Sequence, residues 1–170
     1  MKNIEKYLNI LHFCFYKADY KLHLLSNKIN PFHLIHKLPF QKRRYESLGI
    51  DPIEHINKIW GNKRYGFSII LSSGGLVIAL FLIFITVFDI MNCIFQYPVK
   101  SSGLPFLFCA LLAYTICHYT VFKGDKYLRY FQQFEKWSKA EEWKYSLFTF
   151  AFVAGSIILW LYSFRFLPKL

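Results

Sequence analysis

Three stretches of this chain contain no Asp, Glu, Lys or Arg, and they limit the possible folds more than any other feature. They cover residues 67–88, 104–122 and 145–164 and contain 22, 19 and 20 residues. Because an α-helix rises about 1.5 Å per residue, each stretch makes a helix about 30 Å long, enough to cross the hydrocarbon core of a bilayer. The sequence therefore predicts an all-α integral membrane protein with three transmembrane helices.

The composition agrees with a membrane location. The chain of 170 residues is 55% hydrophobic and 21% aromatic, which is more than a small soluble domain usually contains. A net charge of +11 is also typical of nucleic-acid-binding proteins. Here the basic residues flank the apolar stretches, where an anionic lipid surface attracts each of them by about 1 kcal/mol. We therefore expect contacts with the lipid bilayer and no nucleic-acid partner. The expected headgroup contacts are Lys42, Arg43, Arg44, Lys63 and Arg64.

The distribution of basic residues predicts the orientation in the membrane. Lys and Arg number 12 in residues 1–64, 1 in residues 89–103, 6 in residues 123–144 and 2 in residues 165–170. Basic residues close to a span stay on the cytoplasmic side. We therefore expect a cytoplasmic N-terminus, a C-terminus on the outer side, and insertion in a bacterial inner membrane. The two basic residues of the tail depart from the rule but are too few to reverse it.

Residues 1–64 are expected to form a cytoplasmic amphipathic helical region, and residues 65–170 the transmembrane region. Apolar residues at alternating spacings of four and three predict a helix over residues 4–29. These residues are Ile4, Leu8, Leu11, Phe15, Ala18, Leu22, Leu25 and Ile29. Such a repeat is typical of a helix that packs against another helix, and an amphipathic helix lying on the membrane or on its own domain fits equally well. A second helix is expected over residues 52–60, with Asp51 as its N-cap.

Each predicted span carries a stripe of small side chains. Small residues let membrane helices approach closely, which is how such helices gain packing contacts. The residues expected at these helix-packing faces are Ser68, Ser72, Gly75, Ala79, Cys109, Ala113, Cys117, Ala151 and Gly155. The pair Gly74-Gly75 has a second interpretation, a functional kink or unwound segment of the kind found in transporters.

The segment between the second and third spans has a helical pattern. Aromatic residues recur at helical spacing over residues 127–137, so the second span is expected to continue into the cytoplasm or to bend at Gly124. Ser138 and Glu141 form a capping-box pattern that predicts the start of the third helix. The resulting hairpin has an aromatic face that is either an internal core or a docking surface. The candidate partner contacts are Leu8, Leu11, Phe15, Leu22, Leu25, Tyr127, Phe131, Phe134 and Trp137.

The sequence contains no recognisable catalytic or cofactor motif. It lacks the nucleophile elbow, the zinc-protease helix, the phosphate-binding loop and the dinucleotide fingerprint. The four cysteines have no metal-type spacing, and His33 and His36 have no third ligand nearby. We therefore expect no enzyme activity, no catalytic residue, no cofactor and no metal site.

These features favour a role in protein contacts. Small-residue faces on three spans, a heptad repeat and an aromatic hairpin offer more contact surface than three helices use by themselves. We expect a structural subunit of a multiprotein inner-membrane assembly, such as a secretion or transport machine, acting as a homo- or hetero-oligomer. The alternative is a membrane regulator or immunity-type protein that binds one partner. An oligomeric channel or transporter is the third possibility.

Overall fold

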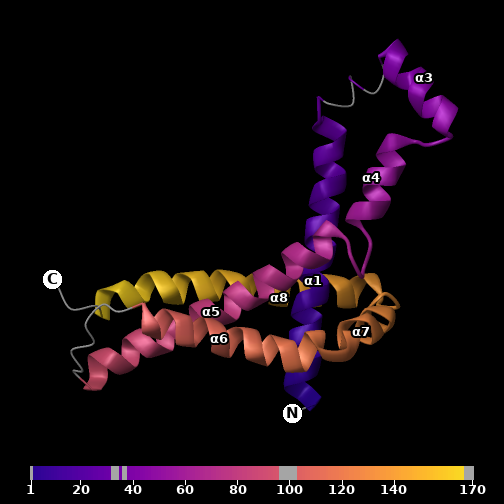
Figure 1. Ribbon diagram of the computed structural model, residues 1–170. Helices are drawn as coiled ribbons and strands as arrows, with labels where there is room; N and C mark the ends of the chain where they lie inside the picture. Colours follow the sequence, from indigo (N-terminus) through magenta and orange to yellow (C-terminus); the bar gives the residue numbers. More distant parts are fainter. Residues whose placement is uncertain (1, 32–34, 36–37, 96–102, 167–170) are drawn as a thin grey trace. The chain divides into compact units, whose positions relative to one another are not determined.

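The computed structural model describes residues 2–31, 35, 38–95 and 103–166 of the chain. Throughout these residues the regular elements are helices and none is a strand (Figure 1). The prediction of an all-α protein is therefore confirmed for the described part of the chain. The pair His33 and His36 lies outside the described residues.

The two helices expected before the first span are present, and a further helix lies between them. Helix α1 covers Lys2–Ile29, α3 covers Pro39–Leu48 and α4 covers Pro52–Trp60. The start of α4 is fixed locally, because the Asp51 carboxylate accepts hydrogen bonds from the backbone N–H groups of Ile53 and Glu54, at 2.8 and 3.3 Å. These bonds satisfy donors that the first helical turn leaves without partners.

The long apolar helices and the turns between them come next. Helix α5 covers Phe67–Phe95, and α6 covers Leu104–Cys117 and continues as a π-helical turn, His118–Phe122. A short 3-10 turn, Lys123–Asp125, leads into α7, Lys126–Phe134, and α8 covers Lys139–Ser163.

Among the described residues, three helical segments are long and apolar enough to cross a membrane. They are Phe67–Phe95, Leu104–Phe134 and Lys139–Ser163, with mean hydropathies of 2.6, 1.6 and 1.7 over their most apolar windows. At most 33% of any of these windows is buried inside the protein. Most of each apolar surface is therefore not covered by the rest of the described chain, and the prediction of three helices of membrane-spanning length is confirmed.

The start of α8 confirms the expected capping box. The Ser138 hydroxyl accepts a hydrogen bond from the Glu141 backbone N–H at 3.3 Å, and the Glu141 carboxylate accepts one from the Ser138 backbone N–H at 2.9 Å. Both bonds satisfy N–H groups that have no partner inside the helix.

The second span bends at Gly124, which was one of the two expected arrangements. Gly124 has a φ of 67° and Asp125 a φ of 52°, so two consecutive residues lie in the left-handed region. A glycine adopts this conformation without the steric cost that a Cβ adds. The chain therefore leaves the α6 direction here and starts α7 as a separate helix.

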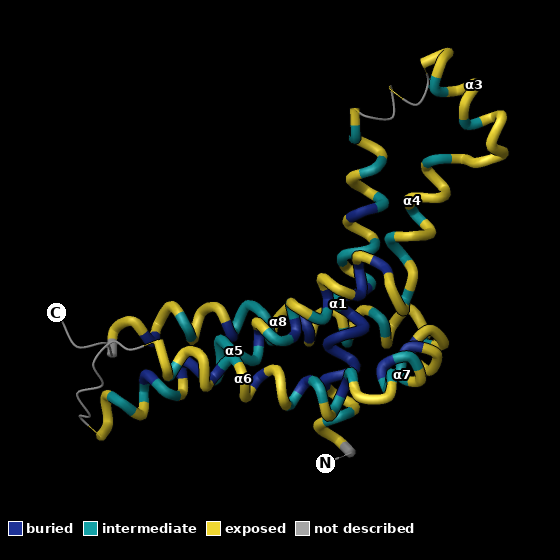
Figure 2. Tube along the Cα trace, in the orientation of Figure 1, coloured by how far each residue is buried: buried dark blue, intermediate teal, exposed yellow. Residues whose placement is uncertain are grey.

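The chain divides into two compact units, and both α1 and α5 contribute to each of them. The first unit contains residues 1–15 and 73–170, and the second contains residues 16–72. The boundary expected near residue 64 separates a cytoplasmic from a transmembrane region and stays a prediction. In the first half of α1, residues 8–14 are all buried (Figure 2).

Candidate functional sites

The first half of α1 forms an aromatic core with α7 in the first unit. The Phe13 ring packs edge-on against those of Phe131, Phe134 and Trp137, with centroids 5.0, 5.6 and 5.5 Å apart. Edge-to-face pairs of this kind contribute about 0.5–1.5 kcal/mol each beyond the burial of their area. Of the two uses considered for the aromatic face of the hairpin, the internal core is therefore the one that these residues make.

The structure separates the candidate partner contacts into three groups. Leu8, Leu11, Tyr127, Phe131 and Phe134 are buried within the chain. Phe15 and Trp137 are half-buried. Leu22 and Leu25 have exposed fractions of 64% and 54%. Among these candidates only the last group is exposed, and both of its residues lie beyond Phe15 on α1.

Polar groups of α1 cap the broken end of the second span. Because the helix ends at Gly124, backbone carbonyls in the preceding turn lack their helical donors. The Asn9 side chain donates from Nδ2 to the carbonyl of Thr120 at 3.1 Å and to that of Glu5 at 2.7 Å. Asn9 is fully buried, and its Oδ1 has no hydrogen-bond partner among the described residues. The side chain is thus held in place through its donor group.

An ion pair completes this cap. The Lys126 ammonium donates to the carbonyl of Tyr119 at 3.0 Å and to the Glu5 carboxylate at 3.1 Å. The Tyr130 hydroxyl donates to the other Glu5 oxygen at 3.2 Å. The Glu5 and Lys126 side chains are about a quarter exposed. The ion pair therefore joins the start of α1 to the start of α7. It also holds the Lys126 ammonium on the Tyr119 carbonyl, next to the bend.

His12 continues the polar face of α1. It is fully buried, its Nε2 lies 3.0 Å from the Ser73 hydroxyl, and its ring packs against those of Phe122 and Tyr127 at 5.8 and 5.4 Å. Glu5, Asn9 and His12 follow one another at spacings of four and three, so they share one face of the helix. The sequence analysis missed this polar face, although its helical spacing within an apolar segment is a signal that could have found it.

The small-residue faces of the first two spans are buried. Among the predicted packing residues, Ser68, Ser72, Ala79, Cys109, Ala113 and Cys117 have exposed fractions of 4% or less. Gly75 is half-buried, and a Cβ built there would lie 3.7 Å from the Phe15 ring. Helix α5 continues as an α-helix through both Gly74 and Gly75.

In the third span, the predicted packing residues Ala151 and Gly155 are not among the buried ones. Ala151 is exposed and Gly155 is half-buried, with open space where its Cβ would lie. The buried residues of α8 are Thr149, Ser156 and Ser163. Their hydroxyls donate to carbonyls of the preceding turn of α8, which lets these residues pack as small side chains. The Ser163 hydroxyl also lies 2.9 Å from the Asp89 carboxylate, which joins α8 to α5.

In the second unit, α1 packs on α4 through polar and aromatic side chains. The His23 ring stacks on Trp60 at 4.1 Å, with an interplanar angle of 4°. The Trp60 indole N–H donates to the Asp19 carboxylate at 3.2 Å, and the Asn27 side chain donates to that of Asn57 at 2.6 Å. The exposed Leu22 and Leu25 do not belong to this polar contact.

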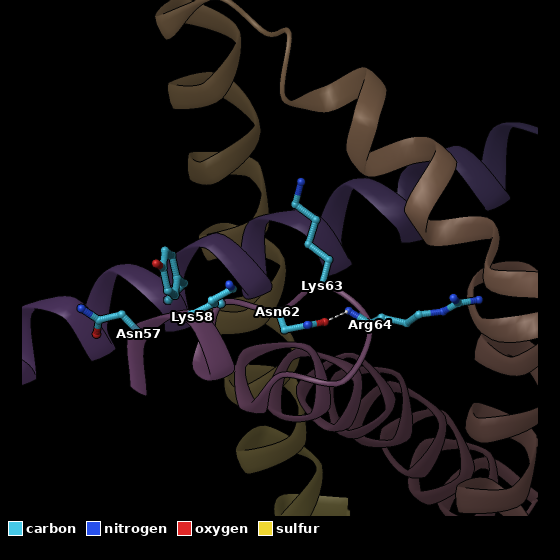
Figure 3. A pocket seen from close by; sticks show the side chains of 7 residues that line it. Asn57, Lys58, Asn62, Lys63 and Arg64 are labelled. Carbon is cyan, nitrogen blue, oxygen red and sulfur yellow. Dashed lines mark hydrogen bonds between the residues drawn. The ribbon is translucent and has the colours of Figure 1, made fainter. Parts of the chain in front are cut away.

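A basic pocket lies at the turn between α4 and α5 in the second unit (Figure 3). Its volume is about 420 Å³. It is lined by Tyr20, Asn57, Lys58, Gly61, Asn62, Lys63 and Arg64. Two of the expected headgroup contacts, Lys63 and Arg64, are thus placed together with a third cation and two side-chain amides. Asn57 and Lys58 lie on α4, close in sequence to Lys63 and Arg64, whereas Tyr20 joins the lining only because α1 pairs with α4.

The other expected headgroup contacts lie on α3. Lys42, Arg43 and Arg44 are exposed, and Lys42 forms an ion pair with Glu46 at 3.7 Å. Arg43 and Arg44 line a second, open pocket of about 630 Å³ with Pro39 and Phe40. This pocket has cationic and apolar walls but lacks the amide groups of the first.

The described residues hold no group of three or more His, Cys, Asp or Glu side chains that could bind a metal ion. Comparisons with protein-family models, with curated proteins and with solved structures give no match. The functional argument therefore depends on the contacts and surfaces of the chain itself.

Proposed function

We propose that the chain is a non-catalytic structural subunit of a multiprotein assembly in a bacterial inner membrane, such as a secretion or transport machine. In this proposal the N-terminus is cytoplasmic and the C-terminus lies on the outer side. Small-residue faces hold the spans together, and the second half of α1 contacts a partner subunit.

The single observation that carries this proposal is the uncovered apolar row of α1. Residues 16–29 face α4 with Tyr16, Asp19, His23 and Asn27, whereas the apolar side of the same segment remains outward. On that side Leu22, Leu25 and Ile29 have exposed fractions of 64%, 54% and 77%. An apolar row at heptad spacing is typical of a helix that packs against another helix.

Photocrosslinking from the apolar row tests this role. A photoreactive amino acid placed at Leu22 or Leu25 of the full chain, expressed in its native membrane, should crosslink to a defined protein species. The same amino acid at Ser26 or Lys28, exposed positions of α1 outside the row, is the matched control and should crosslink far less. A monodisperse monomer in mild detergent, with crosslinks to lipid alone, would contradict the proposal.

The outcome also distinguishes the alternatives. A single crosslinked partner in a one-to-one complex, whose activity changes when the complex forms, supports the regulator or immunity-type protein instead. Conductance of the purified chain in planar bilayers supports an oligomeric channel. The subunit role requires several partners or a fixed oligomer and gives no conductance.

A further inference from the structure

The basic pocket combines three positive charges with neutral hydrogen-bonding groups. Lys58, Lys63 and Arg64 supply the cations, and Asn57 and Asn62 supply side-chain amides, while none of the lining residues carries a carboxylate. Arg and Lys side chains are the usual protein ligands of phosphate groups. In Figure 3, Lys63 and Arg64 extend in different directions from the turn, so the pocket presents a broad cationic rim rather than a closed cage. The lining therefore favours an extended anionic group over a small inorganic anion.

Local hydrogen bonds fix the turn from which two of the cations project. The side-chain oxygen of Asn62, Oδ1, accepts hydrogen bonds from the backbone N–H groups of Arg64 and Tyr65, at 2.8 and 3.0 Å. The backbone N–H of Gly66 donates to the Asn62 carbonyl at 2.8 Å, and a Cβ on Gly66 would collide with backbone atoms of Trp60 and Asn62. This turn therefore has a defined shape before any ligand binds.

The rest of the pocket is also built by specific contacts. A Cβ on Gly61 would lie 2.6 Å from the Tyr20 ring, so the glycine allows the ring to lie directly on the α4 end. The Tyr16 hydroxyl donates to the carbonyl of Gly61 at 2.6 Å. Asn57 is held by Asn27 and His23 at 2.6 and 3.1 Å. The nearby Asp19 carboxylate is engaged by the Trp60 indole at 3.2 Å and does not line the pocket.

The covalent chain places this pocket at the membrane surface. Arg64 precedes Phe67, the first residue of α5, by three residues, which span at most about 10 Å. The Trp60 ring packs on Phe67 at 5.0 Å, and Tyr65 lies between them in the chain. Trp and Tyr occupy the headgroup level of membrane proteins. If α5 crosses the bilayer, the pocket lies at the depth of the lipid headgroups.

We propose that this pocket binds the phosphate-bearing headgroup of an anionic membrane lipid. Lys58, Lys63 and Arg64 attract the negative charge of the headgroup from different sides of the pocket, and the side-chain amides contact its remaining polar atoms. The pocket is open to the surface, with a volume of about 420 Å³, so it leaves room for a whole headgroup beside the phosphate. The proposal requires α5 to cross lipid but does not depend on the subunit role.

The experiment compares two variants with equal loss of charge. The full chain is purified in mild detergent, and short-chain phosphatidylglycerol, phosphatidylcholine or inorganic phosphate is added. Native mass spectrometry then counts bound lipids, and thermal unfolding reports their stabilising effect. The pocket variant is K58Q/K63Q/R64Q, and the matched control K136Q/K139Q/K144Q removes three exposed cations around the start of α8. A K58R/K63R variant, which keeps the charges, tests that the site tolerates substitution.

The expected result is tight binding of phosphatidylglycerol to the parent, the α8 control and K58R/K63R, with weak binding of phosphatidylcholine. The pocket variant should bind about 100-fold more weakly, since each cation near an anionic lipid contributes about a factor of five. Equal losses in the pocket variant and the α8 control would show a non-specific charge effect and overturn the proposal. So would a larger loss in the α8 control, unchanged binding by the pocket variant, or stabilisation by inorganic phosphate equal to that by the lipid.

Discussion

Removal of the Phe131 ring should separate α1 from the hairpin. Phe131 is fully buried, and its ring lies 5.0 Å from that of Phe13, 5.3 Å from that of His12 and 5.6 Å from that of Tyr127. Phe→Ala substitutions in protein cores cost about 3–5 kcal/mol. Because three ring contacts are lost together, we expect Phe131→Ala to lie near the upper end of this range.

Phe150→Ala is the matched control for this substitution. Phe150 is 71% exposed on α8, within an apolar segment of membrane-spanning length. Its side chain is lost from a surface that faces lipid or detergent, so little packing inside the protein disappears. We expect the free energy of unfolding to change by less than about 1 kcal/mol, as is usual for surface positions.

The assay is unfolding of both variants in the same detergent, followed by circular dichroism and by protease cleavage near the N-terminus. Phe131→Ala should lower the midpoint strongly and make the first half of α1 cleavable under conditions in which the parent resists. Phe150→Ala should behave as the parent does. Equal midpoints for the two variants, with α1 protected in both, would refute the docking of α1 on α7.

Three further substitutions or fusions test other parts of the structure. Asn9→Asp replaces the donor to the Thr120 carbonyl with a second acceptor, so it should cost about 3 kcal/mol or more in the free energy of unfolding at neutral pH. Unfolding in detergent should show that stability partly recovers at acid pH, where the carboxyl is neutral. A loss of stability that does not depend on pH would contradict this geometry. Ser138→Ala removes the capping box and should cost about 0.5–2 kcal/mol; an unchanged thermal midpoint would contradict the cap. A reporter active only in the cytoplasm and fused after Leu170 should remain inactive, and strong activity would reverse the proposed orientation.

Features that depend on short sequence segments could be predicted. The apolar stretches gave the starts of α5 and α6, because charge is excluded along a whole helix length. The Asp51 cap and the Ser138 capping box were also predictable, since each joins residues at most three positions apart. Such signals require no knowledge of the tertiary contacts.

Features that depend on residues far apart in the chain could not be predicted from the sequence in the same way. The heptad repeat of α1 indicated that the helix packs, but it did not show that Phe13 meets Phe131 or that Leu22 stays exposed. Asn9 looked like one polar residue in an amphipathic helix, and its role depends on a carbonyl 111 positions later. The basic pocket likewise required Tyr20 and Lys58 to be brought together by the pairing of two helices.

The packed row of α8 has a consequence for how that helix winds. Thr149, Ser156 and Ser163 repeat every seven residues, whereas two turns of a straight α-helix contain slightly more than seven, so the row drifts by about 20° per repeat. A helix keeps such a row against its neighbours by coiling around them with a left-handed twist. One inserted residue between Thr149 and Ser156 would rotate the distal segment by about 100°, which turns the Ser163 hydroxyl away from Asp89. A left-handed coiling of α8 would thus keep all three hydroxyl-bearing side chains packed.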